Sequence, residues 1–234
     1  MKMLIACWLW LVLSFHLVLA ALGTLRWAET GYPQYLPWVP LALAHELGPS
    51  TSAKVRRLQE NPDSCMAVLN EAQLRVTPLA LRTEPQCTIP DAVSLQRFHY
   101  EYVPSYVPMS CPLAVSLGLW ERHIVQNAAA QYLQTNVTRI HHYGTYNCRP
   151  IRGGRSSALS THASATSIDI AAFDLADGRR ISIARDYGKE GPEGEFLRAI
   201  KRGGCQVFGT VLSPDYNAAH ADHFHMQQRG GLCR

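Results

Sequence analysis

The sequence predicts an α+β fold, with helices packed on a small antiparallel sheet and an N-terminal membrane helix. Apolar residues recur at helical spacing between Ser110 and Gln134, and β-rich runs follow this segment. The run from Leu4 to Leu25 contains no Asp, Glu, Lys or Arg. With 234 residues and 47% hydrophobic residues, the chain is long enough for one globular domain plus an anchor.

The uncharged N-terminal run is expected to be a membrane anchor over residues 1–25. As a helix it would measure about 33 Å, which spans a bilayer core, whereas a signal-peptide core needs only about 7–15 residues. Cleavage after Ala20 or Gly23 is the alternative. Lys2 and Arg26 flank the run evenly, so charge gives no orientation.

A spacer is expected over residues 26–52, before a folded domain over 53–234. Its prolines prevent a long helix, and its aromatic residues are expected at the membrane interface. The prolines are Pro33, Pro37, Pro40 and Pro49, and the aromatic residues include Tyr32, Tyr35 and Trp38. Short helices are predicted over 54–58 and 63–72, and a turn closed by Pro90 over 87–93.

Six cysteines remain when Cys7 in the anchor is set aside. An even number in one domain predicts three disulfides and an oxidising compartment. A cysteine-bound structural zinc is disfavoured because the sequence contains no C-x2-C pair. Of the fifteen possible pairings, proximity in sequence favours Cys65 with Cys87, Cys111 with Cys148, and Cys205 with Cys233.

The helix predicted over 110–134 starts at Ser110 as a cap and tolerates Pro112 in its first turn. Its apolar stripe is expected to be core, and Trp120 on that stripe is expected to pack rather than bind substrate. The stripe consists of Leu113, Leu117, Trp120, Ile124, Ala128 and Tyr132.

The remaining elements are predicted from β-rich runs and turn signals. Asp177-Gly178 indicates a tight hairpin, and Gly203 with Gly204 is expected to end a helix. The predicted strands are 137–143, 168–175, 180–184 and 206–212, the helix is 193–202, and a loop follows over 213–219.

Two short stretches, STHASATSID at 160–169 and HADHFH at 220–225, contain four histidines and two aspartates. Imidazole and carboxylate groups are ordinary zinc ligands, and a catalytic zinc usually keeps three protein ligands with one open position. His162, Asp169 and His225 are therefore the predicted ligands of Zn2+. By contrast, His141 and His142 in the strand over 137–143 are expected to be packed or solvated.

Asp222 and His223 lie just before the third predicted ligand. Both are residue types that take a proton from an activated water, so either is a candidate general base. His220 is expected to orient a ligand or the base.

The sequence resembles the extensin-like C-terminal domain family over residues 61–234. More distantly, it is similar to zinc D-Ala-D-Ala peptidases of the LAS group (lysostaphin, D-Ala-D-Ala and sonic-hedgehog types). The motifs that carry the resemblance are GTYNCR at 144–149, STH at 160–162, IDIAAF at 168–173, DGR at 177–179, FL at 196–197, Cys205, FGTVL at 208–212, HADHFH at 220–225 and CR at 233–234.

The resemblance implies that Arg149 polarises a substrate carbonyl or steadies an oxyanion. Some peptidase relatives use an acidic base where this chain has Asp222, and others use a histidine where it has His223. Ala165 stands where those relatives often have a glycine, which bears on how tightly the turn after His162 closes.

The expected function is hydrolysis of an amide bond in bacterial peptidoglycan by a zinc-dependent enzyme. The alternative is a non-catalytic cell-wall-binding module that keeps the same fold. The net charge of +4, without a long basic run, argues against nucleic-acid binding. A single-pass inner-membrane protein with its domain in the periplasm is expected, with a secreted periplasmic protein as the alternative.

Overall fold

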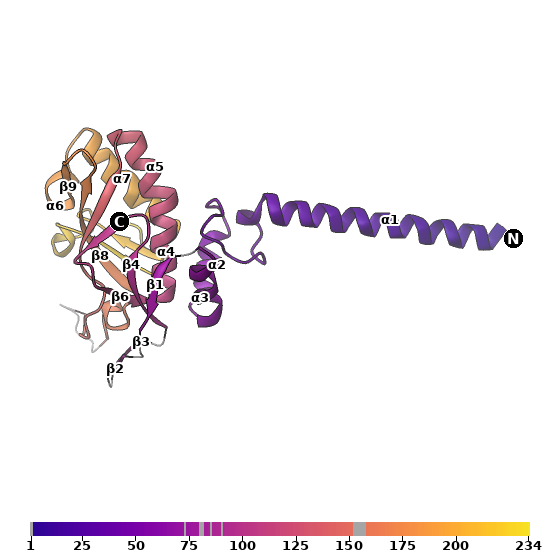
Figure 1. The fold of residues 1–234 in the computed structure, drawn as a ribbon, viewed down its shortest axis with the longest axis horizontal. Helices are drawn as coiled ribbons and strands as arrows, with labels where there is room; N and C mark the ends of the chain where they lie inside the picture. Colours follow the sequence, from indigo (N-terminus) through magenta and orange to yellow (C-terminus); the bar gives the residue numbers. More distant parts are fainter. Residues whose placement is uncertain (1, 73, 80–81, 85, 90, 152–157) are drawn as a thin grey trace.

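A computed structural model of the protein describes residues 2–72, 74–79, 82–84, 86–89, 91–151 and 158–234. In it, helix α1 (Lys2–Gly31) projects from an α+β body (Figure 1). The part of α1 from Cys7 to Gly31 is long and apolar enough to span a membrane, and it is not buried against the body. The apolar N-terminal helix is thus confirmed, and it extends beyond residue 25. Its length and composition suit a membrane span and a signal sequence alike.

Part of the segment that was expected to be a spacer packs onto the body. Leu41 and Leu43 are buried in the main core, and the backbone oxygen of Leu43 lies 2.8 Å from Nε2 of His123. A short 3-10 turn, η1 (Pro33–Tyr35), follows α1, and Lys54 donates to the oxygen of Pro33 at 2.7 Å. The packed part of the chain therefore begins before residue 53.

Two short helices follow, as predicted from the sequence. They are α2 (Thr51–Leu58) and α3 (Pro62–Glu71). The side chain of Asn61 caps α3 by accepting from the backbone N–H of Ser64. Both helices lie between α1 and the rest of the body (Figure 1).

The main sheet has the strand order β10-β11-β8-β7-β5, and β9 pairs with β8 as well. Its strands are β5 (Glu101–Val103), β7 (Val137–Gly144), β8 (Ser167–Leu175), β9 (Arg180–Ser182), β10 (Thr210–Leu212) and β11 (Phe224–Gln227). All its pairs are antiparallel except β5 with β7, so the sheet is mixed rather than purely antiparallel. The predicted hairpin is confirmed, with Gly178 at a φ of +87° between β8 and β9.

Several boundaries differ from the predictions. Residues 183–186 form the short helix α6 (Ile183–Asp186) instead of extending β9. Residues 206–209 form turns, and only Thr210–Leu212 is a strand. A Cβ on Gly209 would lie 2.4 Å from the backbone oxygen of Gln228, which explains why glycine stands at this close approach.

Two smaller sheets were not predicted. One has the order β1-β4-β6, from β1 (Arg75–Pro78), β4 (Ala92–Arg97) and β6 (Val107–Ser110). The other pairs β2 (Arg82–Glu84) with β3 (Cys87–Ile89). The turn predicted over 87–93 is therefore largely strand, and Pro90 lies outside the described residues.

The helix predicted over 110–134 is present as one continuous helical segment. It comprises α4 (Cys111–Trp120), a π-helical turn η2 (Glu121–Val125), α5 (Gln126–Ala128) and a second π-helical turn η3 (Ala129–Leu133). Every residue of α4 is buried, so this helix is surrounded by protein rather than amphipathic. Ser110 stands at the N-cap position, but its side chain does not make the capping hydrogen bond that was expected.

Trp120 is fully buried, as predicted, and its indole N–H donates to the backbone oxygen of Ile200 at 3.0 Å. Ile200 belongs to α7 (Pro192–Gly204). This helix includes Gly203 and Gly204 instead of ending before them. A side chain at Gly204 would meet Met226, so the two glycines allow α7 to pack closely against the core.

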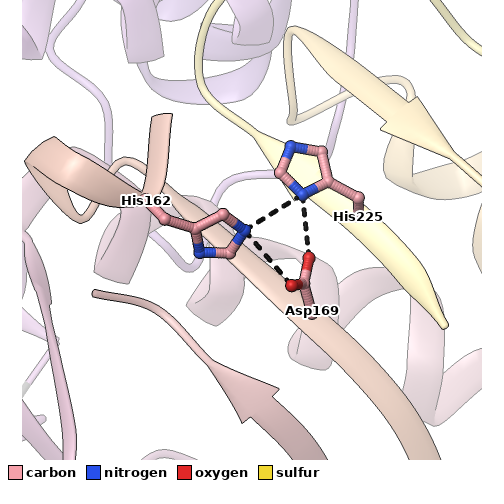
Figure 2. A group of neighbouring side chains, drawn as sticks. All are labelled: His162, Asp169 and His225. Atoms are coloured by element: carbon pink, nitrogen blue, oxygen red, sulfur yellow. Dashed lines mark hydrogen bonds and ion pairs between the residues drawn. The ribbon is translucent and has the colours of Figure 1, made fainter. Parts of the chain in front are cut away.

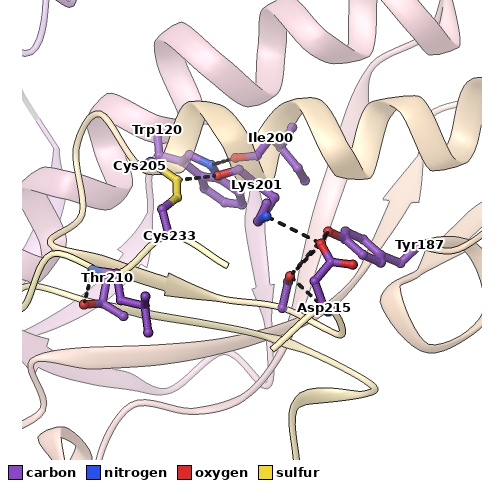
Figure 3. The surroundings of a disulfide bond; sticks show 10 residues. Trp120, Tyr187, Ile200, Lys201, Cys205, Thr210, Asp215 and Cys233 are labelled. Atoms are coloured by element: carbon purple, nitrogen blue, oxygen red, sulfur yellow. Dashed lines mark hydrogen bonds and ion pairs between the residues drawn. A yellow bond between two sulfur atoms is a disulfide. The ribbon is translucent and has the colours of Figure 1, made fainter. Parts of the chain in front are cut away.

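Three disulfides are present, as predicted, but two of the predicted pairings are wrong. The bonds join Cys65 to Cys111, Cys87 to Cys148, and Cys205 to Cys233. Only the third matches, and Figure 3 shows it beside α7. Proximity in sequence failed for the other two because α3 packs on the start of α4, which brings Cys65 to Cys111. Cys87 is then left to pair with Cys148.

Candidate metal centre

The two histidine-rich stretches meet across neighbouring strands of the main sheet. Strands β8 and β11 are antiparallel partners, and Asp169 lies directly opposite His225 in their register. Directly opposed side chains extend from the same face of a sheet. His162 comes from η4 (Thr161–Ser164), a 3-10 turn just before β8.

The turn that carries His162 is closed by local hydrogen bonds. The side chain of Ser160 accepts from the backbone N–H of His162, and the oxygen of His162 accepts from Asn147 at 3.0 Å. Ala165 ends the turn in the left-handed conformation, with a φ of +50°. An alanine rarely adopts this conformation, so the turn after His162 closes tightly at a conformational cost.

Nitrogen and oxygen atoms of the three predicted ligands converge (Figure 2). Nε2 of His162 lies 3.2 Å from Oδ2 of Asp169, and Nδ1 of His225 lies 2.8 Å from Oδ1 of Asp169. The two ring nitrogens are 3.3 Å apart. Ligand atoms about 2.0–2.2 Å from a tetrahedral zinc lie roughly 3.3–3.6 Å from one another, so the three groups are near that spacing.

The other nitrogen of each ring faces an oxygen. Nδ1 of His162 lies 3.2 Å from the backbone oxygen of Thr145, and Nε2 of His225 lies 2.9 Å from Oε1 of Gln227. If these nitrogens carry the N–H and donate it, the lone pairs of the converging nitrogens face each other and Asp169. Metal-binding histidines commonly have this arrangement.

Gln227 and Thr145 were not predicted from the sequence. The available signal was the alternation of β11, which puts Gln227 on the same face as His225. The hydroxyl of Thr161 also donates to Oε1 of Gln227, at 3.1 Å. The amide is therefore held from both sides.

Asp169 is ionised in this setting. Burial alone would raise the pKa of its carboxyl group, but when the two rings are protonated, hydrogen bonds from His162 and His225 and their positive charge outweigh burial. The pKa consequently lies well below its usual range. His162 is buried, whereas Asp169 and His225 are half-buried, so the cluster is reached from one side.

His223 lies beside the three converging side chains. Its Nδ1 is 2.8 Å from Oδ1 of Asp222, and its Nε2 is 3.7 Å from Oδ1 of Asp169. The exposed Asp222 thus contacts Nδ1 of the ring, while Nε2 on its other side faces the cluster. The exposed Tyr143, which was not predicted, packs its ring edge-on against His223, with centroids 5.8 Å apart. Partial burial and then Asp222 raise the pKa of this tyrosine.

His220 packs against both neighbouring histidines. Its ring centroid lies 5.2 Å from that of His223 and 5.9 Å from that of His225, and its Nδ1 is 2.7 Å from Oδ1 of Asn217. Burial, followed by the charges of His223 and His225, lowers the pKa of His220. The neutral ring is therefore favoured at this position.

The two histidines of β7 lie outside this cluster. Nε2 of His141 is 2.9 Å from Oδ2 of Asp174, and Nε2 of His142 is 2.8 Å from the oxygen of Pro104. His142 is also buried against Tyr102. Both rings have packing partners of their own.

Arg149 is connected to the cluster through its backbone. Its oxygen accepts from the backbone N–H of Ser160, at the start of the turn that carries His162. Its Nη1 donates to the oxygen of Pro150 at 3.3 Å, and its buried Nε has no partner. Among the described residues, no hydrogen bond or ion pair joins its guanidinium group to the three predicted ligands.

A hollow of about 250 Å3 adjoins the same turn. Hydroxyl side chains and one exposed cation line much of it, namely Thr88, Ser160, Thr161, Ser164, Thr166 and Arg229. Thr161 connects the hollow to the cluster because its hydroxyl reaches Gln227, which contacts His225. The hollow is therefore linked to His225 through Thr161 and Gln227.

A family model described as "Extensin-like protein C-terminus" matches residues 63–234. This match includes the three converging side chains, Arg149 and the hollow, and it excludes α1 and α2. No curated protein and no solved structure matches the chain. Because the matched residues make up most of the sequence, the chain belongs to the extensin-like C-terminal family.

Proposed function

We propose that this protein is a zinc-dependent hydrolase that cleaves an amide bond in cell-wall peptide. The observation that carries the proposal is the convergence of His162, Asp169 and His225 near the spacing of tetrahedral ligands, with the far nitrogen of each ring beside an oxygen. Zinc at this position would supply Lewis acidity, which activates water and polarises a carbonyl group.

Two residues beside the predicted ligands supply the proton chemistry. His223 is the proposed general base, because Nε2 of its ring faces the cluster while Asp222 holds Nδ1. Asp222 is exposed on the far side of the ring, so its role is to orient His223 and to stabilise its protonated form. Of the two candidate bases, the geometry therefore favours His223.

The substrate side of the proposal rests on the hydroxyl groups and the arginine that line the hollow, and on the resemblance to LAS peptidases. The hydroxyl-lined hollow with Arg229 suits a polar chain that carries a carboxylate, such as a peptidoglycan stem peptide. Arg149 has a guanidinium Nε without a partner beside the same turn. It is proposed to bind the carbonyl oxygen or carboxylate of that chain.

Zinc content combined with digestion of purified muropeptides tests the proposal. The wild-type protein should bind zinc near stoichiometrically and release a new amine from the peptide. Alanine at His162, Asp169 or His225 should abolish both properties, because two remaining ligands do not replace the third. His141→Ala is the matched control and should keep both, since His141 contacts Asp174 instead.

The results separate the alternatives. Full zinc content in His162→Ala would show that the ligand assignment is wrong. Tight zinc binding by the wild type without cleavage of any wall fragment would support the non-catalytic wall-binding module instead.

The proposed location is the inner membrane, with α1 as a single span and the disulfide-bonded body in the periplasm. Three disulfides require an oxidising compartment, and α1 is long enough to anchor the chain. Carbonate washing should leave the protein in the membrane pellet. A soluble form that begins near Ala21 or Thr24 would instead show that α1 is a cleaved signal sequence.

A further inference from the structure

A cavity of about 520 Å3 lies between residues 37–41 and the helices α2 and α3. Sites for small molecules measure roughly 300–1,000 Å3, so the cavity is of ligand size. Its walls combine apolar and cationic side chains, including Pro37, Trp38, Pro40, Lys54, Arg57 and Leu58. Most of this wall precedes the residues matched by the family model.

The cavity is held at the end of the apolar helix α1. The indole N–H of Trp38 donates to Oε1 of Glu29, in the last turns of α1, at 3.3 Å. Lys54 donates to the oxygen of Pro33, and Arg57 donates to the oxygen of Pro37. These bonds fix α2 and the cavity wall next to the point where α1 ends.

Exposed aromatic side chains surround this junction. They are Trp27, Tyr32, Tyr35 and Trp38. Tryptophan and tyrosine concentrate at the membrane–water interface, where their rings contact both lipid and water. If α1 spans a bilayer, the cavity consequently lies at the level of the lipid headgroups.

The cavity wall contains a buried cation without a counterion. Lys54 is only 4% exposed, and its ammonium group donates to one backbone oxygen. Among the described residues, no ion pair involves Lys54 or its neighbour Arg57, although Glu60 also lines the cavity. Burial, followed by the charge of Arg57, lowers the pKa of Lys54. A buried charge is costly unless an opposite charge approaches it.

We propose that this cavity binds the headgroup of an anionic phospholipid from the membrane that α1 enters. The phosphate oxygens would accept hydrogen bonds from Lys54 and Arg57, which brings the missing negative charge to the buried ammonium group. Trp38, Pro37 and Pro40 would contact the glycerol and the upper acyl chains. The inference is independent of zinc and of any hydrolase activity.

Native mass spectrometry of the full chain in detergent tests the proposal, with phosphatidylglycerol and phosphatidylcholine supplied in equal amounts. One phosphatidylglycerol should remain bound and phosphatidylcholine should not. Arg57→Gln should lower the retained lipid roughly fivefold, because it removes one cation at the headgroup. Arg57→Lys, which keeps the charge, should restore most of it.

Arg56→Gln is the matched control. Arg56 is the adjacent residue on α2, is exposed like Arg57, and lines a different hollow beside the Cys205–Cys233 bond. It should leave lipid retention unchanged. Lys54→Gln is expected to lose the lipid as well, but Lys54 also supports the fold, so the decisive comparison is between the two arginines.

Three results would overturn the proposal. One is equal retention of the two lipids by the wild type. Another is an equal loss in Arg56→Gln and Arg57→Gln, which would indicate a general surface attraction. The third is displacement of phosphatidylglycerol by millimolar inorganic phosphate, which would show that a free anion rather than a lipid is the ligand.

Discussion

Oε1 of Gln227 lies 2.9 Å from Nε2 of His225, on the side of the ring that faces away from Asp169. The two residues are two apart on β11, so their side chains extend from the same face. This contact fixes the ring orientation that turns Nδ1 toward Asp169. The neutral amide of Gln227 thus leaves Nδ1, rather than Nε2, of His225 free to bind a metal.

Gln227→Ala should weaken zinc binding about 10–100-fold, because the ring of His225 loses the acceptor that orients it. Competition with a chromophoric chelator measures this affinity. Gln227→Glu retains an oxygen at the same place and should recover most of the loss. Gln126→Ala, at an exposed position of α5, should have no effect. An unchanged affinity in Gln227→Ala would remove this residue from the site.

His223→Ala should lower turnover of a muropeptide substrate roughly 10²–10⁴-fold while zinc stays near stoichiometric, because a base is lost and the ligands remain. Asp222→Asn should cause a smaller loss, since its side-chain oxygen still accepts from Nδ1 of His223. Turnover and zinc content are measured on the same preparation. If Asp222→Asn were the more damaging change, Asp222 and not His223 would be the base.

Arg229→Ala should raise KM about tenfold with little change in kcat for a substrate that carries a free carboxylate, because a charge-assisted contact at an exposed position is removed. The amidated form of the same substrate should not distinguish the variant from the wild type. Arg202→Ala is the control, since Arg202 is exposed on α7 and does not line the hollow. A fall in kcat alone would contradict a binding role for Arg229.

Glu121 predicts a pH dependence of stability. It is fully buried, and burial raises the pKa of its carboxyl group from 4.5 to about 7, against hydrogen bonds from Tyr102, His99 and Tyr100. The folded state therefore keeps a proton that the unfolded chain releases near pH 4.5. The shifted pKa of Glu121 therefore adds its full contribution to the free energy of unfolding below that pH. This contribution, roughly 3 kcal/mol, is lost as the pH rises through 7.

Urea unfolding at pH 5 and pH 8 measures this contribution. The free energy of unfolding of the wild type should fall more between these values than that of Glu121→Gln, which cannot titrate. Parallel losses in the two proteins would assign the pH dependence to other groups.

The features predicted from the sequence depend mainly on local patterns. A few neighbouring residues are enough to predict the helix over 110–134, the turn at Gly178 and the strand over 137–143. The structure contains all three. The proximity of His162, Asp169 and His225 was also predicted, because residue types suited to one metal were concentrated in two short stretches. Their binding of zinc stays a prediction.

What was missed depends on packing between distant segments. Cys65 and Cys111 meet because α3 packs on α4, and no local pattern contains that contact. Leu43 is buried in the core although its neighbourhood is rich in proline, because residues 32–50 pack along α2 and α4. Gln227 is an ordinary strand residue by type, and only its contact with the ring of His225 gives it significance.

The disulfides of Cys65 with Cys111 and of Cys87 with Cys148 interleave along the chain. Of the six disulfide-bonded cysteines, synthesis delivers Cys65 and Cys87 first, so these two thiols are expected to meet before either has its partner. A bond between them is non-native and is undone only by thiol–disulfide exchange. The yield of correctly folded protein is therefore expected to depend on a disulfide isomerase, whereas the bond between Cys205 and Cys233 is expected to form without such correction.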